Sequence, residues 1–212
     1  MIQQFIKQNN SDTLLLFFAG WGMDTTPFQN TFKGEDDVCI CYDYTTLDFD
    51  YSILTPYRHI KVIAWSLGVW VANCILRDKN LPIVYATAIN GTCEAIDDKK
   101  GIPIDIYIGT LNGLNDRSLE KFNLRMCGNA SLKKIFDSLR PKRSLESLKD
   151  ELQALYDHVT SNQLSNSIYT KAILGQNDRI FPAQNQQLAW QGLEVEITNY
   201  AHLPINLIEG YE

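Results

Sequence analysis

The chain has 212 residues and 45% of them are hydrophobic, which suits one ordinary folded domain and argues against disorder. Its formal net charge of −6 excludes a generally basic surface that binds nucleic acid. The polar segment 1–11 lacks the layout of a signal peptide, and the apolar run 14–19 is too short to span a bilayer. We therefore expect a cytoplasmic protein without membrane insertion.

Cysteine and histidine usage argues against disulfides and metal sites. The five cysteines are odd in number and include no C-x-x-C pair, and Cys39 and Cys41 alternate within an apparent strand. We expect small buried thiols in a reducing compartment. None of the three histidines is spaced with cysteine, aspartate or histidine as a ligand set, so neither a metal nor another cofactor is predicted.

Six apolar segments are predicted to be strands. The first, from Leu14 to Phe18, is continuously apolar, as in a strand buried on both faces. The others follow at 38–42, 59–64, 83–89, 171–174 and 194–198. The clearest helix covers 67–76, where Trp70 and Cys74 have i,i+4 spacing. Strands that alternate with helices predict a mostly parallel sheet with helices on both faces.

The segment 104–168 has a different pattern. Helical stretches are predicted at 118–126, 132–139 and 145–158, and no convincing strand follows Ile108. We interpret this segment as a helical lid insertion between the fourth and fifth predicted strands. The core of the domain is then formed by 1–103 and 169–212.

A candidate nucleophile lies where the third predicted strand meets the first helix. Ala64-x-Ser66-x-Gly68 differs by one residue from the G-x-S-x-G nucleophile elbow, in which small residues permit a sharp strand-to-helix turn. Ala64 replaces the usual first glycine and adds one methyl group. In this context the motif predicts an α/β-hydrolase fold with Ser66 as the catalytic serine.

In this fold the triad residues follow one another in the order serine, acid, histidine. His59 precedes Ser66 and is excluded by that order. His158 lies in a polar part of the insertion and is interpreted as a solvated helix residue. His202 follows the last predicted strand and precedes Pro204, which we expect to begin a helix, so His202 is the predicted general base.

The predicted acid is Asp178, which follows the strand 171–174 after a glycine turn. Its carboxylate would hold the histidine in the correct tautomer and stabilise the imidazolium. Asp150 and Asp157 fall within the insertion and are weaker candidates. For the oxyanion hole we expect the backbone N–H groups of Leu67, which follows the serine, and of Trp21, which follows the first buried strand between two glycines.

At these residues the chain resembles the pimeloyl-acyl carrier protein methyl ester esterases of biotin synthesis, and within them the short BioG-type branch. The matching segments span most of the chain and comprise 17–23, 41–44, 47–49, 64–69, 89–92, 175–178 and 201–204. The resemblance implies a serine carboxylesterase. Its substrate would be the methyl ester of a pimeloyl chain on an acyl carrier protein, hydrolysed to the free acid and methanol.

The insertion carries a local excess of basic residues. Between Gly101 and Asp150, nine lysines and arginines stand against six acidic residues. A basic face near the active site would suit an acidic carrier protein, and Lys133, Lys134, Arg140 and Arg143, together with Lys142, are the candidate contacts. A solvated helical surface with no partner explains the same charge pattern.

Two alternative functions stay open. A general carboxylesterase or a thioesterase would use the same triad, and relative rates on ester and thioester substrates would separate them. A catalytically dead hydrolase fold that serves as a binding module belongs to another class of function, and labelling by a fluorophosphonate probe would test it.

Overall fold

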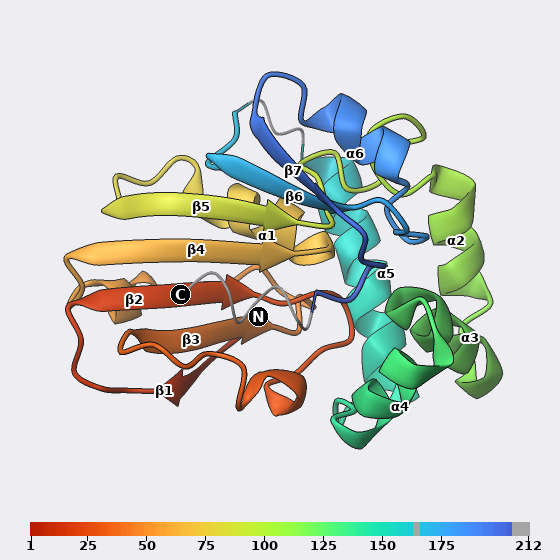
Figure 1. Ribbon diagram of the computed structural model, residues 1–212, viewed down its shortest axis with the longest axis horizontal. Helices are drawn as coiled ribbons and strands as arrows, with labels where there is room; N and C mark the ends of the chain where they lie inside the picture. Colours follow the sequence, from red (N-terminus) through yellow and green to blue (C-terminus); the bar gives the residue numbers. More distant parts are fainter. Residues whose placement is uncertain (163–165, 205–212) are drawn as a thin grey trace.

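A seven-stranded sheet runs through the computed structural model, which describes residues 1–162 and 166–204 (Figure 1). Its strand order is β1-β3-β2-β4-β5-β6-β7, in which β1 pairs antiparallel with β3 and all other neighbours are parallel. The strands are β1 (Ile2–Lys7), β2 (Thr13–Phe18), β3 (Asp37–Tyr42), β4 (His59–Trp65), β5 (Ile83–Ile89), β6 (Lys171–Gly175) and β7 (Glu194–Thr198).

The six predicted strands are confirmed to within one residue at each end, whereas β1 is an addition. This strand lies at the edge of the sheet and is only partly buried, so Ile2, Phe5 and Ile6 are mixed with polar residues instead of forming an apolar run. A short segment with half of its residues polar and no regular alternation gives a weak strand signal in sequence.

The helices are α1 (Leu67–Leu76), α2 (Ile104–Asn112), α3 (Asp116–Cys127), α4 (Ala130–Ser138), α5 (Leu145–Ser161) and α6 (Ala183–Ala189), with short 3-10 turns η1 (Thr26–Phe28) and η2 (Tyr51–Leu54). The three helical stretches predicted in the insertion correspond to α3, α4 and α5. The pattern does not predict α2, because Ile104, Ile106 and Ile108 alternate with other residues as in a strand.

The core lies on both faces of the sheet. In β2, Leu14, Leu16 and Phe18 point to the face that packs against α1, and Leu15 and Phe17 point to the other face. The described residues that cover this second face come largely from the segment 24–34 and from the insertion, and include Phe28, Phe32, Met126 and Phe136. All five cysteines are free; those at 39, 41 and 127 are buried, whereas those at 74 and 93 are half-buried.

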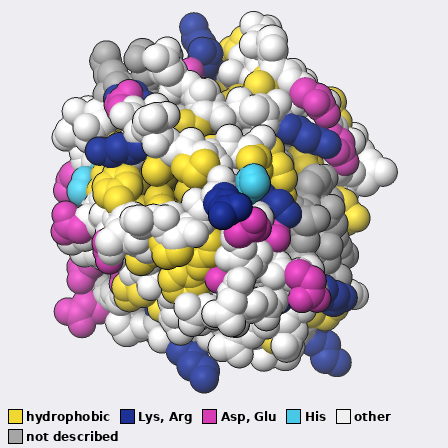
Figure 2. Space-filling model, turned by 90° about the vertical axis from the view of Figure 1, so that its left-hand side faces the viewer, with side chains coloured by type: hydrophobic (Ala, Val, Ile, Leu, Met, Phe, Trp, Pro, Cys, Tyr) yellow, Lys and Arg dark blue, Asp and Glu magenta, His cyan; other side chains and the backbone are white. Residues whose placement is uncertain are grey.

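Helices α2 to α5 lie beyond the carboxyl ends of the parallel strands (Figure 1). Hydrogen bonds join them to the segments that follow β2 and β7: the indole N–H of Trp21 donates to the carbonyl of Leu148, and the N–H of Leu203 donates to that of Met126. Figure 2 shows the opposite end of the molecule, where acidic and basic side chains are interspersed. In the described part of the chain, no helix has the length and apolar character needed to span a membrane.

Two glycines provide a matched test of this packing. A Cβ on Gly91 would lie 2.2 Å from the carbonyl oxygen of Ser66, whereas one on Gly109, in the exposed side of α2, would meet nothing within 4 Å. We expect Gly91→Ala to lower the free energy of unfolding by about 3 kcal/mol, because backbone must move. Gly109→Ala should raise it by about 0.5–1 kcal/mol through helix propensity.

Denaturant unfolding followed by circular dichroism measures both changes. A Gly91→Ala variant as stable as the wild-type protein would contradict the close approach of β5 to the Ser66 turn.

Candidate active site

Ser66 stands at the turn between β4 and α1 with φ 61° and ψ −132°, a strained conformation for a residue that carries a side chain. Its backbone N–H donates to the carbonyl of Ile89, at 3.0 Å, which ties the turn to the end of β5. A Cβ on Gly68 would lie 2.4 Å from the carbonyl oxygen of Ala19, so only glycine fits there. The motif therefore has the strand–turn–helix geometry of a nucleophile elbow.

His202 lies on the segment after β7, and its ring is buried against the serine. Its Nε2 is 2.8 Å from the Oγ of Ser66, and its Nδ1 is 2.8 Å from the Oδ2 of Asp178. The ring stacks on Phe181, with an interplanar angle of 5°, and also contacts the indole of Trp65. The three residues predicted to form the triad thus come together from three loops at the carboxyl ends of the strands.

The carboxylate of Asp178 is fully occupied as an acceptor. Its Oδ1 accepts hydrogen bonds from the backbone N–H groups of Ile180 (2.7 Å) and Phe181 (3.0 Å), and its Oδ2 accepts one from the amide of Gln186 (3.1 Å). With Asp178 ionised, its carboxylate can only accept, and the hydrogen bond to His202 then requires a proton on Nδ1. The Nε2 is then the acceptor for the hydroxyl of Ser66, which is the arrangement that general-base catalysis requires.

Asn90 is a residue of this site to which the sequence reasoning assigned no role. It is fully buried at the end of β5 with φ 46°. Its Nδ2 donates to the carbonyls of Ala201 (3.0 Å) and His202 (2.9 Å), and its Oδ1 accepts from the N–H of Gly175 (2.6 Å). The indole of Trp65 donates to the same His202 carbonyl at 2.8 Å. These bonds fix the backbone that carries the histidine.

The other histidines lie apart from this cluster. His59 is exposed at the start of β4, at the opposite end of the sheet. His158 was expected to be solvated, but it is half-buried and its Nε2 is buried without a hydrogen-bond partner in the described structure. That expectation is wrong, because the neighbouring residues Tyr156 and Val159 of α5 pack against the hydrophobic core. Asp150 and Asp157 are exposed on α5, and the helix expected from Pro204 falls mostly outside the described residues.

A largely apolar cavity opens over the serine. Trp21 and Leu67, the two predicted oxyanion-hole residues, line it together with Ser66 and His202. Leu67 is the first residue of α1, so its N–H has no acceptor within the helix and is available to a ligand. The remaining apolar lining comes mainly from the insertion and includes Ile102, Ile106, Tyr107, Phe122, Met126 and Leu152. The role of Trp21 and Leu67 stays a prediction.

Two exposed guanidinium groups, those of Arg125 and Arg179, lie at the same cavity. They place positive charge beside an otherwise apolar space. Among the described residues, no group of three or more histidine, cysteine, aspartate or glutamate side chains could hold a metal ion.

The predicted basic contacts of the insertion are largely paired with acids. Lys133 forms ion pairs with Glu120 (2.8 Å) and Asp137 (2.7 Å), and Arg140 contacts the same two carboxylates. Hydrogen bonds from Arg140 and Lys133 lower the pKa of Glu120 below its usual value. Lys134 is exposed and has no ion-pair partner in the described part of the chain.

Arg143 does not lie on an exposed basic face, and this prediction is corrected. Its side chain is only 7% exposed and forms ion pairs with the fully buried Glu151, at 2.8 Å, and with Asp43, at 3.1 Å. A count of charges along the sequence overlooks such pairs, because Asp43 is 100 positions away, directly after β3. Arg143 is therefore an internal link between the insertion and the sheet.

The family model described as "Pimeloyl-ACP methyl esterase BioG" matches residues 1–204. The chain belongs to the BioG family. An uncharacterized protein of Haemophilus influenzae is 38% identical to this BioG-family chain over 180 residues, which are 84% of this chain and 81% of that protein.

A Bacteroides fragilis protein named malonyl-[acyl-carrier protein] O-methyltransferase is 49% identical over 186 residues. The match covers 88% of this BioG-family chain but only 38% of that relative, so the chain spans less than half of the relative's length.

Solved structures agree with the family. The crystal structure of BioG from H. influenzae superposes with a TM-score of 0.89 at 32% identity, covering 99% of this chain and 97% of that one. A lipase-esterase related protein from Clostridium acetobutylicum superposes with a TM-score of 0.68 at 14% identity, covering 99% and 94%. The predicted α/β-hydrolase fold and the resemblance to the BioG branch are confirmed.

Asn90→Asp tests how the histidine segment is held in this BioG-family chain. The change keeps the acceptor for Gly175 but removes both donors to the 201–202 carbonyls and buries a charge beside them. We expect the free energy of unfolding to fall by about 3 kcal/mol in denaturant titrations. Asn30→Asp, at an exposed turn, is the control and should change it by less than about 0.5 kcal/mol. Equal losses of stability in the two variants would contradict the role of Asn90 in holding residues 201 and 202.

Proposed function

We propose that this protein is a serine carboxylesterase that hydrolyses the methyl ester of a pimeloyl chain carried by an acyl carrier protein. The observation that carries the proposal is the pair of hydrogen bonds that join Asp178 to His202 and His202 to Ser66, each 2.8 Å long. Membership of the BioG family supports the substrate, and an apolar cavity at the serine suits an acyl chain.

The reaction follows from this geometry in two steps. The Oγ of Ser66 forms a bond to the ester carbonyl carbon while its proton passes to the Nε2 of His202. The N–H groups of Trp21 and Leu67 receive the developing oxyanion. The bond to the methoxy group then breaks, and methanol leaves with the proton from His202. A water molecule, deprotonated by His202, attacks the acyl-serine, and the serine recovers its proton as the free carboxylic acid departs.

The name of the B. fragilis relative indicates a methyl-transfer activity, which differs from this proposal. We assign that activity to the part of the relative outside the match, because the matched part is 38% of its length and corresponds here to a hydrolase fold. Methyl transfer to a carrier-bound acid and hydrolysis of a carrier-bound methyl ester are chemically opposite steps. Their presence in one chain would let the first protect a carboxylate that the second later releases.

Ser66→Ala and His202→Ala test the triad directly. Each should lower kcat/KM for p-nitrophenyl butyrate on the order of 10³-fold or more, because the two groups act as a unit. Ser66→Ala should also abolish labelling by a fluorophosphonate. His59→Ala, at the far end of β4, is the matched control and should retain wild-type turnover.

Circular dichroism would verify that the variants are folded. A Ser66→Ala protein that keeps a tenth of the wild-type rate would contradict the assignment of the nucleophile.

For the carrier protein we propose a docking face on α3 and α4, revised from the sequence prediction. Lys133 and Arg140 contribute little net charge there, because Glu120 and Asp137 neutralise them, and Arg143 is internal. The candidate contacts on this face are Lys134, from the sequence prediction, and Lys121. Both are exposed, and neither has an ion-pair partner among the described residues. Lys121 lines a depression that shares several residues with the Ser66 cavity, among them Phe122 and Arg125.

The double variant Lys121→Glu/Lys134→Glu tests this face. At low salt, kcat/KM for a carrier-linked methyl ester should fall about tenfold, because steering of an acidic partner is lost. Turnover of p-nitrophenyl butyrate should stay within about twofold, since the chemistry does not pass through these residues. Arg58→Glu/Lys79→Glu, near the opposite end of the sheet, is the matched control and should affect neither substrate.

Equal losses on both substrates would mean that the reversal damaged the insertion. No loss on either would place the carrier protein elsewhere.

The open alternatives give different results in these assays. A thioesterase would cleave the bond between the acyl chain and the carrier protein and leave the methyl ester intact. A binding module without activity would show neither turnover nor labelling of Ser66.

A further inference from the structure

Helix α5 of the insertion carries a buried carboxylate, that of Glu151, which contacts the loops after β2 and β3. Glu151 is fully buried, and its two oxygens reach two different loops. Its Oε2 accepts from the backbone N–H of Gly22, at 3.1 Å, and its Oε1 accepts from that of Tyr44, at 3.0 Å. The guanidinium of Arg143 donates to Oε2 at 2.8 Å.

Stability alone does not account for this arrangement. Removing a charge pair from water costs several kcal/mol, and apolar residues of similar size commonly stabilise such a position as well or better. Burial raises the pKa of Glu151 to about 7, which reflects that cost, while Arg143 and the two backbone donors favour the ionised form. A carboxylate that spans two loops satisfies their N–H groups and fixes where each loop lies.

A second hydrogen bond from the same helix holds the same loop. The indole N–H of Trp21 donates to the carbonyl of Leu148, at 2.8 Å, one helical turn before Glu151. Trp21 and Gly22 are thus both attached to α5, through adjacent residues of the loop after β2. Gly22 has φ 77°, a conformation that favours glycine.

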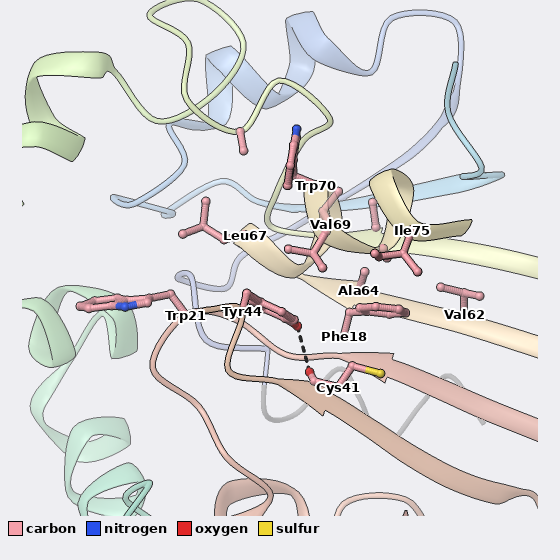
Figure 3. Packing of buried hydrophobic residues seen from close by; sticks show 14 of the residues in the cluster. Phe18, Trp21, Cys41, Tyr44, Val62, Ala64, Leu67, Val69, Trp70 and Ile75 are labelled. Atoms are coloured by element: carbon pink, nitrogen blue, oxygen red, sulfur yellow. Dashed lines mark hydrogen bonds between the residues drawn. The ribbon is translucent and has the colours of Figure 1, made fainter. Parts of the chain in front are cut away.

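The position of this loop matters because its neighbours line the catalytic cavity. Gly20, Trp21 and Leu67 all contribute to the cavity at Ser66. Figure 3 shows Trp21 beyond the sheet, next to the helices of the insertion, and Tyr44 between Trp21 and the strands. The hydroxyl of Tyr44 lies within hydrogen-bond distance of the carbonyls of Ala19 (2.7 Å) and Cys41 (2.9 Å). Glu151 is therefore connected to the loop after β2 directly, through Gly22, and indirectly, through Tyr44.

We propose that Glu151 is a positioning residue for catalysis: by holding the N–H groups of Gly22 and Tyr44, it sets the backbone of Trp21 for stabilisation of the oxyanion. The proposal rests on the esterase function given above and deepens it. It makes the insertion a structural part of the oxyanion hole in addition to a cover for the substrate. Arg143 and Asp43 complete the group of charges that faces the carboxylate.

Glu151→Gln is the test, because the amide keeps the shape of the side chain but places an NH₂ group against one of its three donors. We expect kcat for p-nitrophenyl butyrate to fall 10- to 100-fold, on the order found when a group that orients the transition state moves by about 1 Å. The KM should stay within about threefold, since the apolar cavity is untouched. Glu146→Gln, exposed in the first turn of the same helix, should leave both constants unchanged.

A second readout separates positioning from stability. A trifluoromethyl ketone forms a tetrahedral oxyanion adduct with the serine. The corresponding methyl ketone is much less electrophilic and binds in the cavity without forming the adduct. Affinity for the trifluoromethyl ketone should fall in parallel with kcat in Glu151→Gln, and affinity for the methyl ketone should not. Rates are expressed per site titrated with fluorophosphonate, so unfolded protein does not contribute.

If Glu151→Gln fails to fold, Glu151→Asp carries the same measurement, with an intermediate loss expected because the shorter chain keeps the charge. Unchanged kcat and adduct affinity in a folded variant would overturn the proposal and leave Glu151 a structural residue. A wild-type protein that neither turns over esters nor labels at Ser66 would instead refute the esterase function itself.

Discussion

The sharp turn at Ser66 is the constraint on which the rest of the site depends. A residue with a side chain adopts φ 61° there, and the turn is tolerated because the surrounding backbone lies almost in contact with it. Gly68 admits the end of β2, Gly91 admits the carbonyl of Ser66 itself, and Gly20 lies against the Cβ of the serine. The strands β2, β4 and β5 are therefore locked together at the point where the hydroxyl leaves the sheet.

The other groups of the site are held by hydrogen bonds in which one partner is a backbone N–H or carbonyl group. Asn90 and Trp65 both bind the carbonyl of His202, so the imidazole is oriented by residues at the ends of the two central strands. Two backbone N–H groups bind Asp178, and the insertion binds the loop of Trp21 through Leu148 and Glu151. Such preorganisation lets the site stabilise a charged transition state with little rearrangement.

How much could be predicted from the sequence depended on the kind of signal. Ser66, Asp178 and His202 could be predicted because a local motif, the order along the chain and the ends of strands define their places. Asn90 and Glu151 could not be assigned a role, because each acts on backbone groups far away in sequence, and no spacing shows this. The charge count suggested an exposed basic face, but it could not reveal that Arg143 is paired internally. The edge strand β1 and helix α2 escaped prediction because their apolar residues do not follow the expected periods.

Intact-mass spectrometry of the carrier-linked substrate is the decisive test of the proposed methyl ester hydrolysis. An acyl carrier protein bearing a pimeloyl methyl ester is incubated with the enzyme, and the mass of the whole acylated carrier is followed. We predict the loss of one CH₂ unit, with the thioester to the carrier intact, and no such loss with Ser66→Ala. Release of the unacylated carrier, or an unchanged mass with the wild-type protein, would contradict it.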